Sequence, residues 1–191
     1  MKNLKLNILA AALVAAACAW PFQAPAAESK YDTHTNLAEI IFAPNPYGQR
    51  VITSILASSD VGTGAVKLYG RSGSKVLASE AETNGQFTIT VADNLAITNA
   101  DTIVYVYSDG ATPLVTTAGV CTATSIKLGT AISQAGTTAD AIYEIAQQGE
   151  LKIGTTALNL AGYTVWASPG DSPVYITVNA NTAAVLTATS E

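Results

Sequence analysis

From Arg50 onward the chain is a succession of short runs of Val, Ile, Thr and Tyr, separated by Gly, Asn, Asp and Ser. This spacing of turn formers is typical of antiparallel β-proteins. In residues 86–91 apolar and polar side chains alternate, which predicts a strand with one buried face. The apolar members of that strand are Phe87, Ile89 and Val91. Residues 102–107 are apolar on both faces and predict a central strand.

The whole pattern predicts about ten strands, and no long helix. A single layer of that size would leave apolar faces exposed, so we expect two packed antiparallel sheets, a β-sandwich or jelly roll. A closed barrel is the alternative. Residues 65–69 and 75–78 predict a hairpin around the glycine-rich stretch 70–74. Residues 139–147 fit strand or helical spacing, and the polar residues 147–150 that follow favour a second hairpin.

The first 26 residues have the features of a signal peptide. Two lysines precede an apolar run over residues 6–20, and Ala24-Pro25-Ala26 fits the small-x-small cleavage rule. We therefore expect a mature chain that begins at Ala27 and is exported to the periplasm, the cell surface or the medium, without membrane insertion. Lipidation at Cys18 is an alternative form of processing.

Two parts follow the expected cleavage site. Residues 27–48 are polar or rich in turn formers and predict an extended N-terminal arm. Within this arm Ile40-Ile41-Phe42 is a short apolar piece, which predicts either a first strand or a segment that docks on a neighbouring subunit. Residues 49–191 are expected to form the β-sandwich domain, which is long enough for one core.

Charge and cysteine content narrow the function classes. Loss of two lysines with the signal leaves seven Lys and Arg against 14 Asp and Glu, a net charge near −7. That balance disfavours nucleic acid and anionic lipid as partners. One cysteine would remain, Cys121, so an intradomain disulfide is excluded. Its neighbours predict a strand over residues 120–127, with Cys121 either a buried thiol or an intermolecular disulfide partner.

Chemistry-bearing motifs are scarce. His34 is the sole histidine, which excludes a two-histidine zinc site, and neither a phosphate loop nor a dinucleotide fingerprint occurs. Gly170-Asp171-Ser172 resembles the Gly-Asp-Ser block of the GDSL-type esterases over three residues. That family implies an Asp-x-x-His pair near the chain end, yet no histidine follows Ser172, and Pro173 replaces the expected Leu. We expect no enzyme activity, no cofactor and no metal.

Residues 169–172 instead predict the loop of a hairpin, with Pro169 and Gly170 suited to a type II turn. This register would place Trp166 opposite Tyr175 on an otherwise polar face. Such a pair either stabilises the hairpin or offers a platform for a sugar ring or a protein partner.

These observations favour a non-enzymatic exported structural or interaction protein, a subunit or decoration component of a bacterial cell-surface or extracellular assembly. Ile40, Ile41 and Phe42, or another edge strand, would pair with a protein partner or a second copy. The alternatives are a carbohydrate-binding module that uses Trp166 and Tyr175, and a hydrolase that uses two carboxylates.

Overall fold

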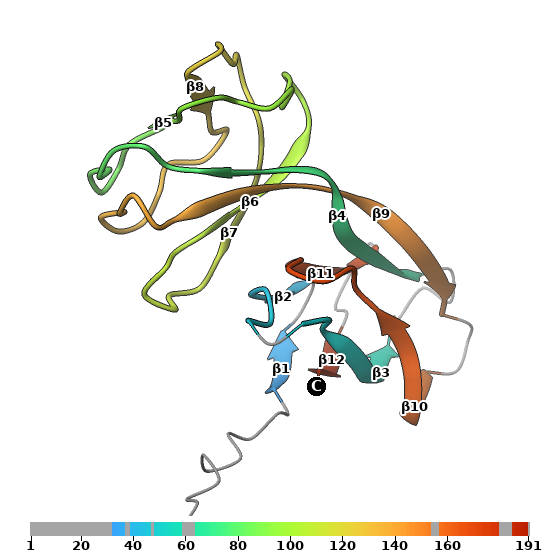
Figure 1. Ribbon diagram of the computed structural model, residues 1–191. Coiled ribbons are helices and arrows are strands. Elements are labelled where there is room, and N and C mark those ends of the chain that lie inside the picture. The colour runs from blue at the N-terminus through green and yellow to red at the C-terminus, as the bar shows by residue number, and fades with distance from the viewer. Residues whose placement is uncertain are drawn as a thin grey trace, which may run out of the picture. The chain divides into compact units, whose positions relative to one another are not determined.

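The computed structural model describes six segments of the chain, to which every structural statement below refers: residues 32–36, 39–46, 48–58, 64–153, 157–179 and 185–190. The expected signal peptide and the first residues of the expected arm lie outside them. Within these segments the protein is all-β, as predicted, with antiparallel sheets (Figure 1). They contain no helix with the length and hydropathy that a membrane crossing requires.

Twelve strands are described, and most are short. In chain order they are β1 (Asp32–Asn36), β2 (Glu39–Phe42), β3 (Val51–Ser58), β4 (Ala65–Leu77), β5 (Thr88–Thr90), β6 (Thr102–Val106), β7 (Leu114–Thr117), β8 (Ser125–Lys127), β9 (Ala141–Lys152), β10 (Leu158–Ala167), β11 (Val174–Asn179) and β12 (Val185–Ser190).

The strands form a sandwich, the predicted fold. A four-stranded sheet in the order β1-β12-β3-β10 packs against the half of a six-stranded sheet that contains β2 and β11. The six-stranded sheet has the order β2-β11-β4-β9-β6-β7, with distinct ends, so it is not a closed barrel. We call the apolar layer between the two sheets the sandwich core. Its fully buried members include Phe42, Ile52, Ile55, Val66, Val174 and Ile176.

A second core lies at the other end of the long strands β4 and β9. There the six-stranded sheet packs against the two-stranded sheet β5-β8, and Ile89, Ile103, Tyr105, Ile126 and Ile142 are buried between them. The central strand β6, predicted from its continuous apolar run, shows why both faces must be covered. Ile103 and Tyr105 point into this second core, whereas Val104 and Val106 join a third cluster on the opposite face, with Tyr143 and Ile145.

Both predicted hairpins within the long strands are wrong. Residues 65–77 form the single strand β4 and residues 141–152 the single strand β9, and these two strands pair with each other along most of their length. The stretch 70–74, which suggested a turn, is an irregularity in this ladder between Arg71 and Lys75. Its glycines serve close approach instead, because a Cβ on Gly70 would lie 2.7 Å from the Trp166 ring.

Two shorter segments also differ from expectation. The alternation over residues 86–91 predicts that Phe87 is buried, but Phe87 precedes β5 and is 48% exposed, whereas Ile89 and Val91 are buried. Residues 120–127 are not one strand: β8 covers Ser125–Lys127, and the residues before it form a tight turn closed by hydrogen bonds between Thr122 and Ser125.

Candidate functional site

Trp166 and Tyr175 do not form the predicted cross-strand pair. β10 pairs with β3, whereas β11 pairs with β2 and β4, so the two aromatic residues belong to different sheets. Trp166 packs on the sandwich core, and Tyr175 lies beside Tyr69 with ring centroids 5.5 Å apart. Residues 168–173 are therefore a crossover between the two sheets. The role of Trp166 and Tyr175 as contact residues stays a prediction.

Two Ser-Pro pairs hold this crossover, one at each sheet. Ser168 Oγ accepts a hydrogen bond from the Arg50 backbone N–H (3.1 Å), just before β3, and donates to the carbonyl of Pro169. Ser172 Oγ accepts from the Arg71 backbone N–H (2.8 Å) on β4 and donates to the carbonyl of Pro173. Both serine side chains are buried. The crossover is thus pinned to β3 and β4 by the same local pattern.

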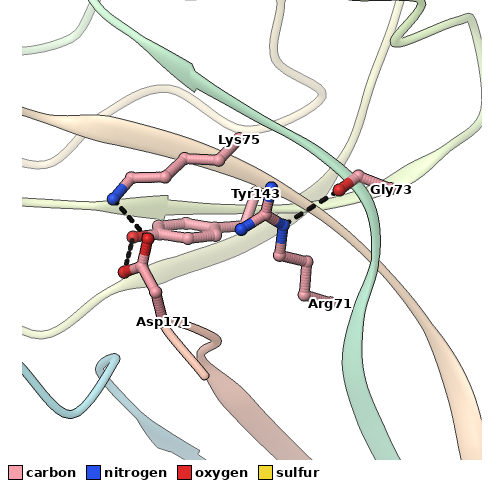
Figure 2. Close-up of polar contacts among 5 residues, drawn as sticks. All are labelled: Arg71, Gly73, Lys75, Tyr143 and Asp171. Carbon is pink, nitrogen blue, oxygen red and sulfur yellow. Dashed lines mark hydrogen bonds and ion pairs between the residues drawn. The ribbon is translucent and has the colours of Figure 1, made fainter. Parts of the chain in front are cut away.

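Between these pins Asp171 reaches the long strands (Figure 2). Its carboxylate accepts hydrogen bonds from Lys75 Nζ on β4 (2.6 Å) and from the Tyr143 hydroxyl on β9 (3.0 Å). Asp171 has a φ of 52°, whereas the left-handed residue of the predicted type II turn would have been Gly170. Asp tolerates this conformation better than most residues, and its side chain secures it here.

The electrostatics of this cluster follow from its partners. Burial alone would raise the pKa of Asp171, but the hydrogen bonds from Lys75 and Tyr143 outweigh burial and lower that pKa. Burial likewise opposes the charge of Lys75, yet its hydrogen bond to Asp171 raises the Lys75 pKa. Both side chains remain accessible, 31% for Lys75 and 51% for Asp171, so water screens the pair. An ion pair of this kind contributes at most about 1 kcal/mol.

The crossover is built as a connector, because its polar groups are already engaged. A nucleophilic serine needs an accessible Oγ beside a base, but Ser172 is 1% exposed and both of its hydrogen bonds go to backbone. The backbone of His34 lies in β1, opposite Ala188 of β12. No cluster of His, Cys, Asp and Glu that suits a metal ion occurs in the described segments.

A second polar network, which sequence reasoning did not single out, lies in the second core. Asp140 is 1% exposed, and its carboxylate accepts hydrogen bonds from the Tyr105 hydroxyl (2.7 Å) and from backbone and hydroxyl groups of Ser108 and Thr137. Burial opposes ionisation of Asp140, but these hydrogen bonds outweigh it and lower its pKa. Burial, together with the bond to Asp140, strongly raises the pKa of Tyr105.

One weak feature of the sequence points to this network. Asp140 follows turn formers and precedes an apolar run, which is a common arrangement for a turn carboxylate. Asp140 differs from other turn carboxylates through the nearby Gly136. Because Gly136 has no Cβ, the Tyr105 hydroxyl and the Asp140 carboxylate can occupy the space beside it. Glu82, also buried, has its Cβ beside the same space at Gly136, and its carboxylate accepts a hydrogen bond from the Thr90 backbone N–H. These two acids are enclosed by the second core.

The remaining predicted contact residues lie inside the fold. Residues 39–42 form β2, an end strand of the six-stranded sheet and the second strand of the chain, not the first. The role of these residues as partner contacts stays a prediction. Ile40 and Phe42 are buried in the sandwich core, and Ile41 packs beside Tyr175 in the third cluster. Cys121 is a free cysteine of intermediate exposure just before the turn at residues 122–125, not a buried strand residue.

Comparisons with known proteins assign no family. No protein-family model matches the chain, and no curated protein matches it in sequence. Among solved structures, those of the infectious bursal disease virus Gt strain and Gx strain are 14% and 12% identical, over 85% and 84% of this chain. The chain spans about 39% and 40% of their lengths, and both TM-scores are 0.13, which is too low to support an argument about fold or function.

Proposed function

We propose that this protein is an exported, non-enzymatic structural subunit of a cell-surface or extracellular assembly, which acts by associating with itself or with a protein partner. The observation that carries the proposal is the set of open sheet edges. Within the described segments, β1 and β10 end the four-stranded sheet, and β2 and β7 end the six-stranded sheet. Edge strands present unpaired N–H and C=O groups, which are the usual means of strand addition between subunits.

Two further features support this proposal. The crossover and the Asp140 network use their polar side chains to hold strands together, which suits a rigid building block. Charged residues make up 12% of the chain, so long stretches of strand carry no charge that would oppose association. Export rests on the signal-peptide features of residues 1–26.

The test is the molar mass of residues 27–191 over a wide range of concentration, measured by sedimentation velocity. We expect the weight-average mass to rise above that of the monomer. A protein that stays monomeric at the highest concentration, and binds no other envelope protein, would contradict the proposal. Deletion of residues 27–48 is not a clean variant, because it removes β2 and takes Ile40 and Phe42 out of the sandwich core.

A carbohydrate-binding role would rest on a different pair from the predicted one. Tyr69 and Tyr175 lie side by side, and the Tyr175 hydroxyl donates to the Glu39 carboxylate (2.6 Å). Ligand sites commonly combine aromatic side chains with a few polar groups that fix the ligand's orientation. This alternative predicts that Tyr175→Phe weakens glycan binding while the protein stays folded, and a parent protein that binds no glycan refutes it.

A further inference from the structure

The edge strand β10 lacks two of the features that usually protect an edge, charge and proline. It pairs with β3, and no other described strand pairs with it (Figure 1). Its ten residues, Leu158–Ala167, contain no charged residue and no proline. Natural sheet edges generally carry lysine, proline, inward-pointing charge or a β-bulge, which prevents pairing with another chain. The irregularity of β10 lies after Ala161, so Leu158–Ala161 remains regular. The neighbouring open stretch of β9, residues 145–152, does carry charge, at Glu150 and Lys152.

The sandwich core is also incompletely covered beside β10. Most of its members are buried, but four hydrophobic residues that pack against it are only partly buried. All four come from β9 and β10, and they are Leu151, Leu158, Val165 and Trp166. These strands meet at this side of the sandwich, since Trp166 of β10 and Gln148 of β9 both approach Gly70. Unpaired backbone and partly covered apolar side chains therefore coincide.

We infer that β10 pairs antiparallel with β10 of a second copy of this chain, which joins two four-stranded sheets into one. This inference rests on the proposed function and names the partner. A two-fold axis perpendicular to the sheet keeps the core-facing side of one strand on the core-facing side of the other. The partly covered apolar residues of the two copies thereby become neighbours, and each sandwich core gains cover from its partner.

The exposure pattern sets the register of this pairing. Ala157 and Asn159 are exposed and Leu158 and Leu160 are partly buried, so side chains alternate between the two faces. Residues directly opposite each other must point to the same face. A two-fold axis through Asn159 meets this condition. It places Asn159 opposite Asn159 of the second copy and Leu158 opposite Leu160, so polar residues face polar residues and apolar residues face apolar ones. No charged group meets another, although the whole chain is acidic.

The length of the ladder limits its strength. β10 is regular against β3 over Leu158–Ala161, and then a register shift occurs between Ala161 and Trp166. A bulge bends a strand away from a straight partner, so the shared ladder centres on Asn159. The contact is therefore smaller than the interface of a permanent dimer, and we expect reversible association in roughly the micromolar range.

The first test uses charge at the two-fold axis, in a Cys121→Ser background, with sedimentation velocity as the readout. Asn159→Lys places two like charges directly opposite each other, and we expect the dimer dissociation constant to rise by about tenfold or more. Asn99→Lys is the matched control, because it makes the same substitution at an exposed turn position outside the four-stranded sheet. Asn159 is exposed, so the urea midpoint of Asn159→Lys should equal that of the parent at a concentration well below the dimer dissociation constant, where both are monomeric.

The second test is cysteine cross-linking. Asn159→Cys should form a disulfide-linked dimer under mild oxidation, since directly opposite Cβ atoms lie within about 4.5–5.5 Å. Ala167→Cys, which is exposed on the same strand beyond the register shift, should not. A parent that associates while Asn159→Lys associates equally and Asn159→Cys does not cross-link overturns the β10 pairing and leaves the proposed function standing. A parent that is monomeric at every concentration overturns the β10 pairing, and it overturns the proposed function as well if it also binds no other envelope protein.

Discussion

The Asp140 network offers the most direct test of how the second core is held together. Asp140→Ala would leave the Tyr105 hydroxyl, which lies in a fully buried residue, without its acceptor, and would also remove the acceptor of the Ser108 and Thr137 backbone N–H groups. An unsatisfied buried donor costs about 1–3 kcal/mol, whereas a lost bond at a hydrated group costs about 1 kcal/mol. Since Ser108 and Thr137 are exposed, we expect a total loss of about 3 kcal/mol in the free energy of unfolding.

The assay is urea unfolding at neutral pH, followed by tyrosine and tryptophan fluorescence. Asp109→Ala is the control, because Asp109 is exposed and accepts only in a turn, from Ala111 and Gln134. Its cost should stay below about 1 kcal/mol. The double variant Tyr105→Phe/Asp140→Ala should lose less free energy of unfolding than the sum of the two single variants. In the double variant the Tyr105 hydroxyl, which Asp140→Ala alone leaves without an acceptor, is absent. Equal costs for Asp140→Ala and Asp109→Ala would refute the reasoning.

The same carboxylate predicts a dependence on pH. The pKa of Asp140 is lower in the folded protein than its ordinary value, so the stability that its charge contributes is fully present above the unfolded pKa of about 4. That contribution is lost as the pH falls from about 4 through the lower folded pKa. Asp140→Asn should therefore flatten the fall of stability over this range, as measured by urea unfolding at several pH values. An unchanged slope would contradict the prediction.

Three further predictions concern the crossover and its surroundings. Gly70→Ala should cost about 1–3 kcal/mol through overlap with the Trp166 ring, whereas Gly170→Ala, which has open space, should change stability little in the same thermal melts. Ser172→Ala should cost about 1–2 kcal/mol, because it leaves the Arg71 backbone N–H without its acceptor; a neutral result would contradict the pinning role. Lys75→Met should cost less than about 1 kcal/mol and lose even this effect in high salt, since the Lys75–Asp171 pair is partly exposed.

Much of the strand content was predictable because it depends on local side-chain pattern. Ile89 and Val91 alternate with polar residues and are buried, and the double-sided apolar run of β6 does lie between two strands with both faces covered. The choice of a sandwich followed from the same pattern, since so many apolar faces require a second layer. Phe87 was misassigned because a position next to a strand fits the alternation equally well whether or not it is paired.

The sequence indicates where the candidate site lies along the chain, but not its conformation or its partners. Gly170-Asp171-Ser172 marks a special segment, but the sequence indicates a hairpin tip, and the chain instead crosses between sheets. The groups that bind this segment are the side chains of Lys75 and Tyr143 and the backbone N–H of Arg71. They lie about 30 to 100 residues away in sequence. Asp140 was likewise unrecognised, because its principal partner Tyr105 comes from a different strand.

Local sequence is enough to predict the all-β class, the burial of the central strand and the neutral composition of residues 158–167, because each depends on residue type and on a spacing of a few positions. Long-range strand pairing sets three other features: the glycines at 70 and 73 permit close approach within one long strand, Trp166 and Tyr175 belong to different sheets, and β10 lies at an edge. Local propensity cannot predict these features, because it is nearly the same for a strand that turns back and for one that continues. The difference lies in which distant strand supplies the hydrogen bonds and covers the apolar face.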